Sequence, residues 1–206
     1  MIKQDWKKDE KHIYAPKAFP MRLNVASFKY LSIQGKSTPG SAVFQSAVEA
    51  LFSLSYGLKF APRKGLVIEG YVDYVVYPLE GLWDLSDEAK IRSTWTKEDL
   101  VYTLMIRQPD FIQEHHVEEI KQRLKLTKNC PYDQVKFEEI EDGECMQILH
   151  SGSFDTEAQS FEIMDNALKE LGLQRKVKAH KEIYLSDFTK TKPENLKTIL
   201  RIFITT

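Results

Sequence analysis

Three polar side chains alternate along the segment from His180 to Ser186, and their types could perform chemistry together. In a β-strand His180, Glu182 and Tyr184 share one face, because successive side chains point to opposite sides. A partly desolvated carboxylate between an imidazole and a phenol has a tunable pKa, and it could recognise a cation or activate a water molecule. The alternative is an ordinary antiparallel strand with a polar, solvated face, which this segment taken alone favours.

A group of aromatic residues in the first half of the chain suits a ligand site. Its members are Tyr71, Tyr74, Tyr77 and Trp83. Tyr and Trp rings form flat stacking walls with a polar tip, which fit a planar aromatic or cationic ligand. For any one of these rings, filling the core is an equally good interpretation. The four rings together therefore indicate a ligand site more strongly than any one of them does.

A third candidate segment, His150 to Glu157, joins the end of an expected strand to the start of an expected helix. It contains His150, Phe154 and two acidic residues, Asp155 and Glu157. Acidic residues are common at a helix start, where they cap backbone N–H groups and interact well with the helix dipole. From these residues alone, that structural explanation is preferred.

Signatures of other chemistries are missing from the sequence. It contains no Gly-rich phosphate loop, HExxH or GxSxG motif. Cys130 and Cys145 have neither CxxC spacing nor a nearby histidine cluster, so two reduced thiols are expected. We expect no metal and no cofactor, which leaves carboxylate-assisted hydrolysis open.

Charge and hydropathy limit the partners and the location. The 29 Lys and Arg residues nearly balance 30 Asp and Glu residues, giving a net charge of -1 and no field that would attract nucleic acid or anionic lipid. Residues 1–12 mix Lys, Asp and Glu and contain no signal-peptide core, and no stretch is apolar enough for a membrane span. We expect a cytoplasmic protein with a small-molecule partner and no direct binding to nucleic acid or membrane.

The elements that must position these residues follow one order twice. Each half shows a β-prone strand, an amphipathic helix and two more strands, separated by Gly, Pro and Ser residues. The expected strands are 23–35, 70–78, 101–107, 135–150 with a turn at 141–143, 180–186 and 198–204, and the expected helices run from Ser41 to Pro62 and from Thr156 to Gly172.

Matching positions support a duplication. Gly35 and Gly152 close corresponding strands, Phe44 and Phe161 occupy corresponding helix positions, and both pairs have the same separation. The sequence predicts an α+β fold of two strand-helix-strand-strand modules, with antiparallel sheets and a pseudo-twofold axis, around a central ligand cleft. Within a single domain of residues 1–206, module one covers about 17–112, a connecting helix about 113–127 and module two about 130–206.

The duplication also predicts the direction in which Glu182 faces. If Ile183 and Leu185 pack beneath the helices, Glu182 lies on the opposite face of the sheet. We expect that face to be where the two halves meet.

Four stretches in this order resemble the GyrI-like family of small-molecule-binding domains. They are EGYVDYVVYPLEGLWDLS at 69–86, LMIRQPDF at 104–111, HSGSF at 150–154 and HKEIYLSD at 180–187. The likeness runs from about Lys17 to the C-terminus and implies a stand-alone domain without a helix-turn-helix. The family is similar to effector-binding domains of multidrug-responsive transcription regulators, where a strand glutamate in an aromatic cleft receives cationic or planar compounds. Glu182 matches that glutamate.

The WDL and HxEIYLSD stretches also resemble a stand-alone branch implicated in hydrolysing cyclopropanoid cyclopropyl DNA-alkylating compounds. This resemblance implies that Glu182 orients or deprotonates water and that Glu157 is a second acid. It also implies that Trp83, Tyr74 and Tyr184 hold the planar ligand. We expect four further residues to contact the ligand, namely Tyr77, His150, Phe154 and His180. Phe154 departs from the family pattern, which usually has Tyr there, so a hydrogen bond from that phenol is missing.

Three functions remain open at this point. The chain could bind and sequester or sense planar xenobiotic compounds, it could be a cofactor-free hydrolase of strained electrophiles, or it could inhibit DNA gyrase by direct contact. The first two share one site and differ in whether the ligand is returned unchanged. The even mixture of charges offers little support for a gyrase-binding surface.

Overall fold

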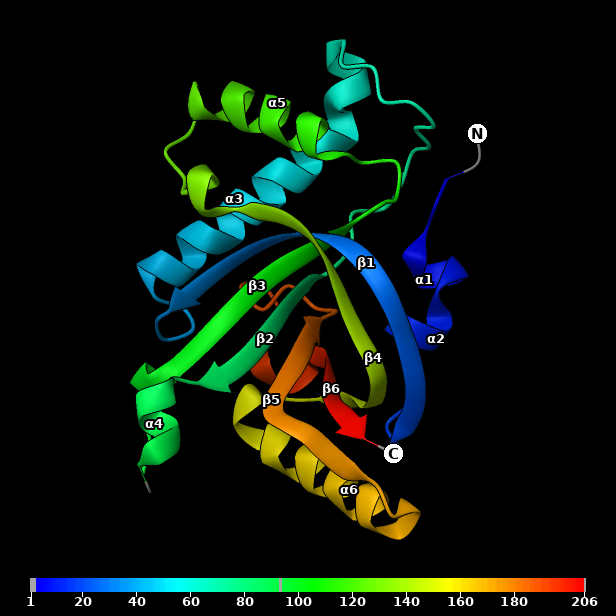
Figure 1. Ribbon diagram of the computed structural model, residues 1–206, viewed down its shortest axis with the longest axis vertical. Helices are drawn as coiled ribbons and strands as arrows, with labels where there is room; N and C mark the ends of the chain where they lie inside the picture. Colours follow the sequence, from blue (N-terminus) through cyan, green and yellow to red (C-terminus); the bar gives the residue numbers. More distant parts are fainter. Residues whose placement is uncertain (1–2, 93, 206) are drawn as a thin grey trace. The chain divides into compact units, whose positions relative to one another are not determined.

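The computed structural model describes residues 3–92 and 94–205 and has a mixed α+β fold. These described residues form six strands and three long helices, which are labelled in Figure 1. The strands are β1 (Met21–Lys36), β2 (Leu79–Leu85), β3 (Leu100–Gln108), β4 (Lys136–Ser151), β5 (Gln174–Tyr184) and β6 (Lys197–Thr205). The helices are α1 (Trp6–Asp9), α2 (Lys11–Tyr14), α3 (Ala42–Phe60), α4 (Asp87–Ile91), α5 (Glu114–Lys125) and α6 (Glu157–Leu171).

The predicted order of strand, helix, strand and strand is present in both halves of the chain. The long helices begin and end close to the expected residues. Ser41 caps α3 by accepting a hydrogen bond from the Phe44 N–H, and Gly172 ends α6 with a φ of 67°. Superposition of residues 23–107 on 135–204 about a pseudo-twofold axis stays a prediction.

The chain folds as two compact units. Unit 1 consists of the segment ending at Asp5 together with Phe28–Leu79 and Leu85–Ile140, and unit 2 consists of Trp6–Ser27, Glu80–Asp84 and the segment starting at Glu141. Strands β1, β2 and β4 therefore contribute residues to both units.

In unit 1, β1 pairs antiparallel with β3 from Lys29 opposite Gln108 to Lys36 opposite Val101. Helix α3 contacts both β3 and α5 in this unit. The buried positions of α3 recur at helical spacing, because one side of the helix packs against its neighbours. These positions are Phe44, Ala47, Ala50, Leu51, Leu54, Ser55 and Leu58.

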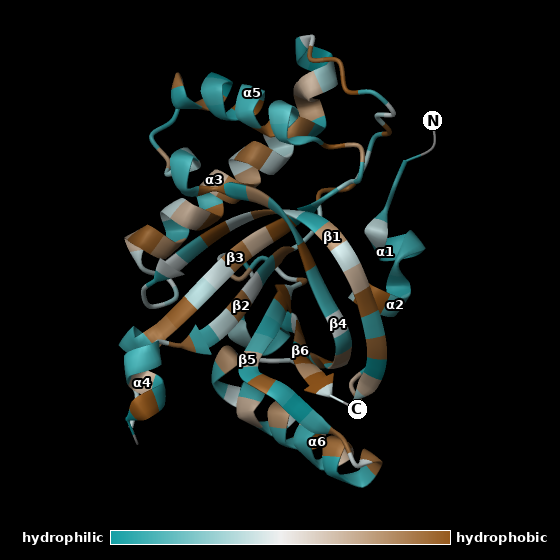
Figure 2. Cartoon of the chain, in the orientation of Figure 1, coloured by the Kyte–Doolittle hydropathy of each residue, from teal (hydrophilic) through white to brown (hydrophobic). Residues whose placement is uncertain are grey.

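In unit 2, β6 pairs antiparallel with both β4 and β5. Figure 1 shows α6 lying along β5, and Figure 2 shows that α6 carries both hydrophilic and hydrophobic residues. The apolar side of α6 supplies Met164 and Leu168 to a core that also contains Met146, Ile148, Leu200 and Ile202. This packing holds α6 against one face of the sheet.

Two expectations about local structure were wrong. Residues 70–78 do not form a strand, since the segment pairs with described residues through the isolated bridge between Gln4 and Tyr74. Tyr74 and Tyr77 are nevertheless buried. The neighbouring residues Leu79–Leu85, which lie outside the expected strands, form β2. The β-prone residues of segment 70–78 are therefore explained by burial and not by pairing in a sheet.

The turn expected at residues 141–143 is also wrong, since β4 continues through it from Lys136 to Ser151. Gly143 has a positive φ of 65°, which glycine adopts without steric cost. The glycine therefore marks a special backbone conformation, but the chain does not reverse its direction there. None of the helices in the described part of the chain is long and apolar enough to cross a membrane.

Candidate functional site

Glu182 lies on the face of β5 that α6 covers. Glu182 pairs with Leu200 and His180 with Ile202, and the side chains of paired residues point to the same side of a sheet. Leu200 and Ile202 belong to the core formed with α6. The expectation that Glu182 faces away from the helices was therefore wrong, because the helix packs on the even-numbered residues of this strand.

A continuous chain of hydrogen bonds surrounds the Glu182 carboxylate. Tyr184 donates its hydroxyl hydrogen to Glu182 Oε2 at 2.7 Å, and Trp83 donates from Nε1 to the Tyr184 hydroxyl oxygen at 2.9 Å. His180 Nε2 lies 3.1 Å from Glu182 Oε1. The strand alternation thus brings the three predicted polar residues into contact. Trp83 joins them from β2, within unit 2.

Tyr184 is held in its protonated form. Burial raises the pKa of Tyr184 well above its usual value, and the negative charge of Glu182 raises it further. A phenol that stays protonated remains a hydrogen-bond donor to the carboxylate. Tyr184 therefore fixes the orientation of Glu182 and does not compete with it for protons.

Glu157 is a second buried carboxyl at this site. It is the first residue of α6, its residue is 8% exposed, and its Oε1 has no hydrogen-bond partner within the described residues. Burial, followed by the charges of Glu182 and Asp155, raises the pKa of Glu157 to about 9. At neutral pH the group is therefore protonated and can donate a hydrogen bond or a proton.

His150 holds the junction between β4 and α6. Its Nδ1 is 2.9 Å from the Ser160 hydroxyl, and its Nε2 is 3.1 Å from the Ser153 carbonyl oxygen and 3.3 Å from Thr156 Oγ1. Both ring nitrogens thus have protein partners. His150 positions the start of α6, and its predicted contact with ligand stays a prediction.

Phe154 lies at the exposed edge of the same group. Its ring meets the Tyr184 ring edge-on at 6.0 Å, and Phe188 meets Tyr184 edge-on at 5.6 Å. Phe154 is 38% exposed. The ring contact with Tyr184 does not require a hydroxyl, so phenylalanine can serve here as a wall.

Tyr74 and Tyr77 belong to unit 1, where both are almost fully buried. Tyr74 packs against the rings of Tyr71 and Phe111, and Arg107 lies over the Tyr77 ring. Burial raises the pKa of Tyr74, whose hydroxyl has no hydrogen-bond partner in the described part of the chain. Their predicted contact with ligand stays a prediction.

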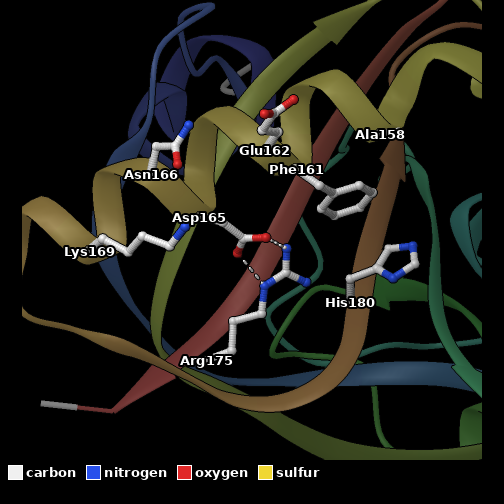
Figure 3. Close-up of a pocket in the computed structure, with 8 residues that line it drawn as sticks. All are labelled: Ala158, Phe161, Glu162, Asp165, Asn166, Lys169, Arg175 and His180. Atoms are coloured by element: carbon white, nitrogen blue, oxygen red, sulfur yellow. Dashed lines mark hydrogen bonds and ion pairs between the residues drawn. The ribbon is translucent and has the colours of Figure 1, made fainter.

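An open pocket of about 500 Å³ lies between α6 and β5, and His180 is part of its wall (Figure 3). Phe161 meets the His180 ring edge-on at 4.7 Å. Arg175 forms a two-point contact with Asp165, with Nε to Oδ1 at 2.7 Å and Nη2 to Oδ2 at 3.0 Å. Arg175 lies outside the strand expected from the sequence, because β5 begins at Gln174 and not at His180.

Groups of three or more His, Cys, Asp or Glu side chains that could hold a metal ion do not occur among residues 3–92 and 94–205. The chemistry that the site can perform with its own residues is acid-base chemistry. It has one carboxylate held by donors, one carboxyl group that stays protonated, and aromatic rings beside them.

A comparison with models of protein families finds a match over most of this chain. Residues 24–205 match the model of the GyrI-like small molecule binding domain. Among curated proteins, none matches this chain.

Solved structures extend this result. A hydrolase from Listeria innocua is 34% identical, with a TM-score of 0.88, covering 98% of this chain and 100% of its own. An uncharacterized conserved protein from Listeria innocua is 35% identical, with a TM-score of 0.90 and coverage of 98% and 100%. The EcmrR C-terminal domain, at 9% identity, a TM-score of 0.52 and coverage of 91% and 97%, shares the fold alone.

Proposed function

This chain belongs to the GyrI-like family of small-molecule-binding domains, and we propose that it is a cofactor-free hydrolase of small, planar, electrophilic compounds. Cyclopropanoid alkylating compounds, whose strained ring is conjugated to a carbonyl group, are the proposed substrate class. The proposed active site comprises Glu182 and Glu157, with Trp83, Tyr184, Phe154 and His180 around the ligand.

The observation that carries the proposal is the difference between the two carboxyl groups. Glu157 is protonated at neutral pH, and the negative charge of Glu182 is one cause of this. Glu182 receives a hydrogen bond from Tyr184 and lies beside His180. A buried carboxyl group with a raised pKa can serve as the general acid beside a second carboxyl group that serves as the general base.

The proposed reaction adds one molecule of water across a strained carbon–carbon bond. Glu182 accepts a proton from water while the water oxygen forms a bond to a cyclopropane carbon. The broken bond leaves its electron pair on the conjugated carbonyl system, and Glu157 donates a proton to the oxygen where negative charge develops. Proton transfer from Glu182 back to Glu157 restores both groups, so the sum of the steps is addition of water.

The similarity to a hydrolase from Listeria innocua supports an enzymatic function, because the likeness covers nearly the full length of both chains. A second candidate is a protein that binds the same compounds and releases them unchanged. The family match favours it, since small-molecule binding is the property that the matching model describes. Both candidates use the same site, so only the fate of the ligand separates them.

Incubation with an aryl cyclopropyl ketone in ¹⁸O-labelled water, followed by mass spectrometry, tests the proposal. A hydrolase converts the ketone into an alcohol that is heavier by one labelled water, at a rate proportional to protein concentration. A binding protein returns the ketone with its original mass even when the two form a complex. Recovery of unchanged ketone from a demonstrated complex would therefore reject the hydrolase and retain the binder.

A further inference from the structure

We propose that Glu80 is a positioning residue for Trp83, which it holds in place through a buried ion pair with Lys181. This inference rests on the proposed function, because the hydrogen bond from Trp83 to Tyr184 orients the group that holds the proposed base, Glu182. Glu80 lies outside the proposed active site and acts through β2, the strand that it shares with Trp83.

Trp83 belongs to a short segment of unit 2. This segment, Glu80–Asp84, is flanked on both sides by chain that belongs to unit 1, up to Leu79 and from Leu85. A segment this short has few side chains that can hold it among the other strands of unit 2. Glu80 and Trp83 are both buried, and the side chains of both contact β5.

The two contacts with β5 lie on opposite faces of the strands. Glu80 Oε2 is 3.2 Å from Lys181 Nζ. Trp83 Nε1 donates to the Tyr184 hydroxyl oxygen at 2.9 Å. Residues three apart in a strand point to opposite faces, and β2 and β5 are neighbours in the sheet. A slip of β2 by one residue would exchange the two faces, so the ion pair helps to fix the register in which Trp83 reaches Tyr184.

Lys181 is held in place by more than Glu80. Its Nζ also lies 2.6 Å from Asp142 Oδ1, and Asp142 Oδ2 lies 2.7 Å from Arg201 Nη1. Asp142, Lys181 and Arg201 come from β4, β5 and β6, and β6 pairs with both of the other strands. Glu80 joins β2 to this buried charge cluster. Loss of the Glu80 charge should therefore release β2 while the other three strands stay together.

The hydrogen bond from Trp83 has a consequence at the proposed base. A hydroxyl group donates one hydrogen and can also accept a hydrogen bond. The Tyr184 oxygen accepts from Trp83, and its own hydrogen goes to Glu182 Oε2 at 2.7 Å. Trp83 thus helps to set the direction of the bond that holds Glu182. A misplacement of about 1 Å far from the chemistry can slow an enzyme about 10²-fold.

Glu80→Gln tests the inference. Glutamine keeps the size of the side chain and an oxygen for the Tyr14 hydroxyl, but it removes the charge that attracts Lys181. Arg201→Gln is the matched control, because it removes one charge from the same cluster at its contact with Asp142 on β4. If Glu80→Gln does not fold, the double variant Glu80→Gln/Lys181→Met replaces it, since removing both charges leaves neither of them buried without the other.

The first readout is the NMR signal of the Trp83 indole N–H, which does not depend on activity. The chain has three Trp residues, and Trp83→Phe identifies the signal that belongs to Trp83. We expect Glu80→Gln to move this signal toward that of Trp95, which is 55% exposed, because the bond to Tyr184 is weakened. Arg201→Gln should leave the signal in place. The chemical shift of the folded molecule does not measure its stability, so destabilisation alone would not move it.

The second readout is alcohol formation from an aryl cyclopropyl ketone. We expect Glu80→Gln to lower kcat by about three- to thirtyfold and to keep KM within about twofold, since Glu80 faces away from the proposed base. Trp83→Phe lacks the indole N–H. In that background Glu80→Gln should lower kcat by less than about twofold, because a residue that acts through Trp83 has no further effect once this hydrogen bond is gone.

Three outcomes overturn the inference. They are an unchanged Trp83 signal in Glu80→Gln, an equal movement of that signal in Arg201→Gln, and equal losses of kcat from Glu80→Gln with and without Trp83→Phe. The last result would mean that Glu80 acts by a route that does not include Trp83. If the wild type forms no alcohol, the proposed function fails, and the indole signal then decides by itself whether Glu80 positions Trp83.

Discussion

The carboxyl group of Glu157 shows how one residue acquires chemistry from its surroundings. Sequence reasoning explains an acidic residue at a helix start by the helix dipole, which favours the charged form. Burial and the nearby charge of Glu182 act in the opposite direction and prevail, so the pKa of Glu157 is about 9. The pattern of residues could indicate a helix start but not the desolvation, which depends on β5 packing across the helix.

This pKa makes stability depend on pH. The folded-state pKa of Glu157, about 9, is above its ordinary value of 4.5, so the folded state binds more protons between these limits. The contribution of Glu157 to the free energy of unfolding is fully present below pH 4.5 and is lost as pH rises through about 9. The slope reaches about 1.4 kcal/mol per pH unit.

Glu157→Gln should remove this contribution, since glutamine stays neutral. Urea unfolding of the wild-type protein and the variant at pH 5, 7 and 9 should show a stability difference that moves in favour of the variant as pH rises. Glu170→Gln, an exposed position on the same helix, is the control and should keep the wild-type pH dependence. Parallel pH profiles for the wild type and Glu157→Gln would contradict the raised pKa.

At the scale of elements, β5 separates two groups of charges on its two faces. Glu182 faces α6, whereas Lys181 points to the other side and contacts Asp142 Oδ1 at 2.6 Å and Glu80 Oε2 at 3.2 Å. Arg201 on β6 contacts Asp142 Oδ2 at 2.7 Å. Burial raises the pKa of Asp142, but the charges of Lys181 and Arg201 outweigh it and hold this pKa below its usual value.

Lys181→Ala should destabilise unit 2 by about 3 to 5 kcal/mol, because it removes a buried cation from the buried carboxylates of Glu80 and Asp142. Lys178→Ala, at an exposed position of the same strand, should change stability by less than about 0.5 kcal/mol. Urea unfolding followed by the fluorescence of Trp6 and Trp83, both buried in unit 2, measures the difference. Similar values for the two variants would mean that the ion pairs of Lys181 contribute little to stability.

Periodicity predicted most elements because it records which side of an element is buried. The helix from Ser41 and the strand ending near His150 lie where the residue pattern indicates. The pattern could not identify Lys181 as buried, since its partners Glu80 and Asp142 are distant in sequence. It also misassigned residues 70–78, where buried tyrosines resemble a strand although the hydrogen-bonded strand follows them.

At the scale of the whole molecule, the predicted acid site is formed within unit 2. Glu157, Glu182 and Tyr184 come from the second half of the chain, and Trp83 comes from the short segment Glu80–Asp84 of the first half. A sequence repeat can indicate two similar halves, but it cannot show that a segment of one half folds with the other. For this reason the residue pattern could suggest candidate members of an acid site but could not show that they lie together in unit 2.

The family match covers residues 24–205, and the likeness to a Listeria innocua hydrolase covers nearly the whole chain. The two carboxyl groups of the site suggest how such a chain could act. In the proposed function, Glu182 is the group that activates water. Substitution by glutamine keeps the shape of this side chain and its ability to accept the Tyr184 hydrogen bond, but it removes the base. The rate of alcohol formation by the Glu182→Gln variant at saturating ligand is therefore the most direct test.

We predict that Glu182→Gln forms the alcohol about 10² to 10⁴ times more slowly than the wild type. Its affinity for an uncharged aryl cyclopropyl ketone should stay within about threefold of the wild-type value, since the shape of the site is kept. Glu170→Gln should react at the wild-type rate. Alcohol formation by Glu182→Gln at the wild-type rate would contradict the role of Glu182 as the base that activates water.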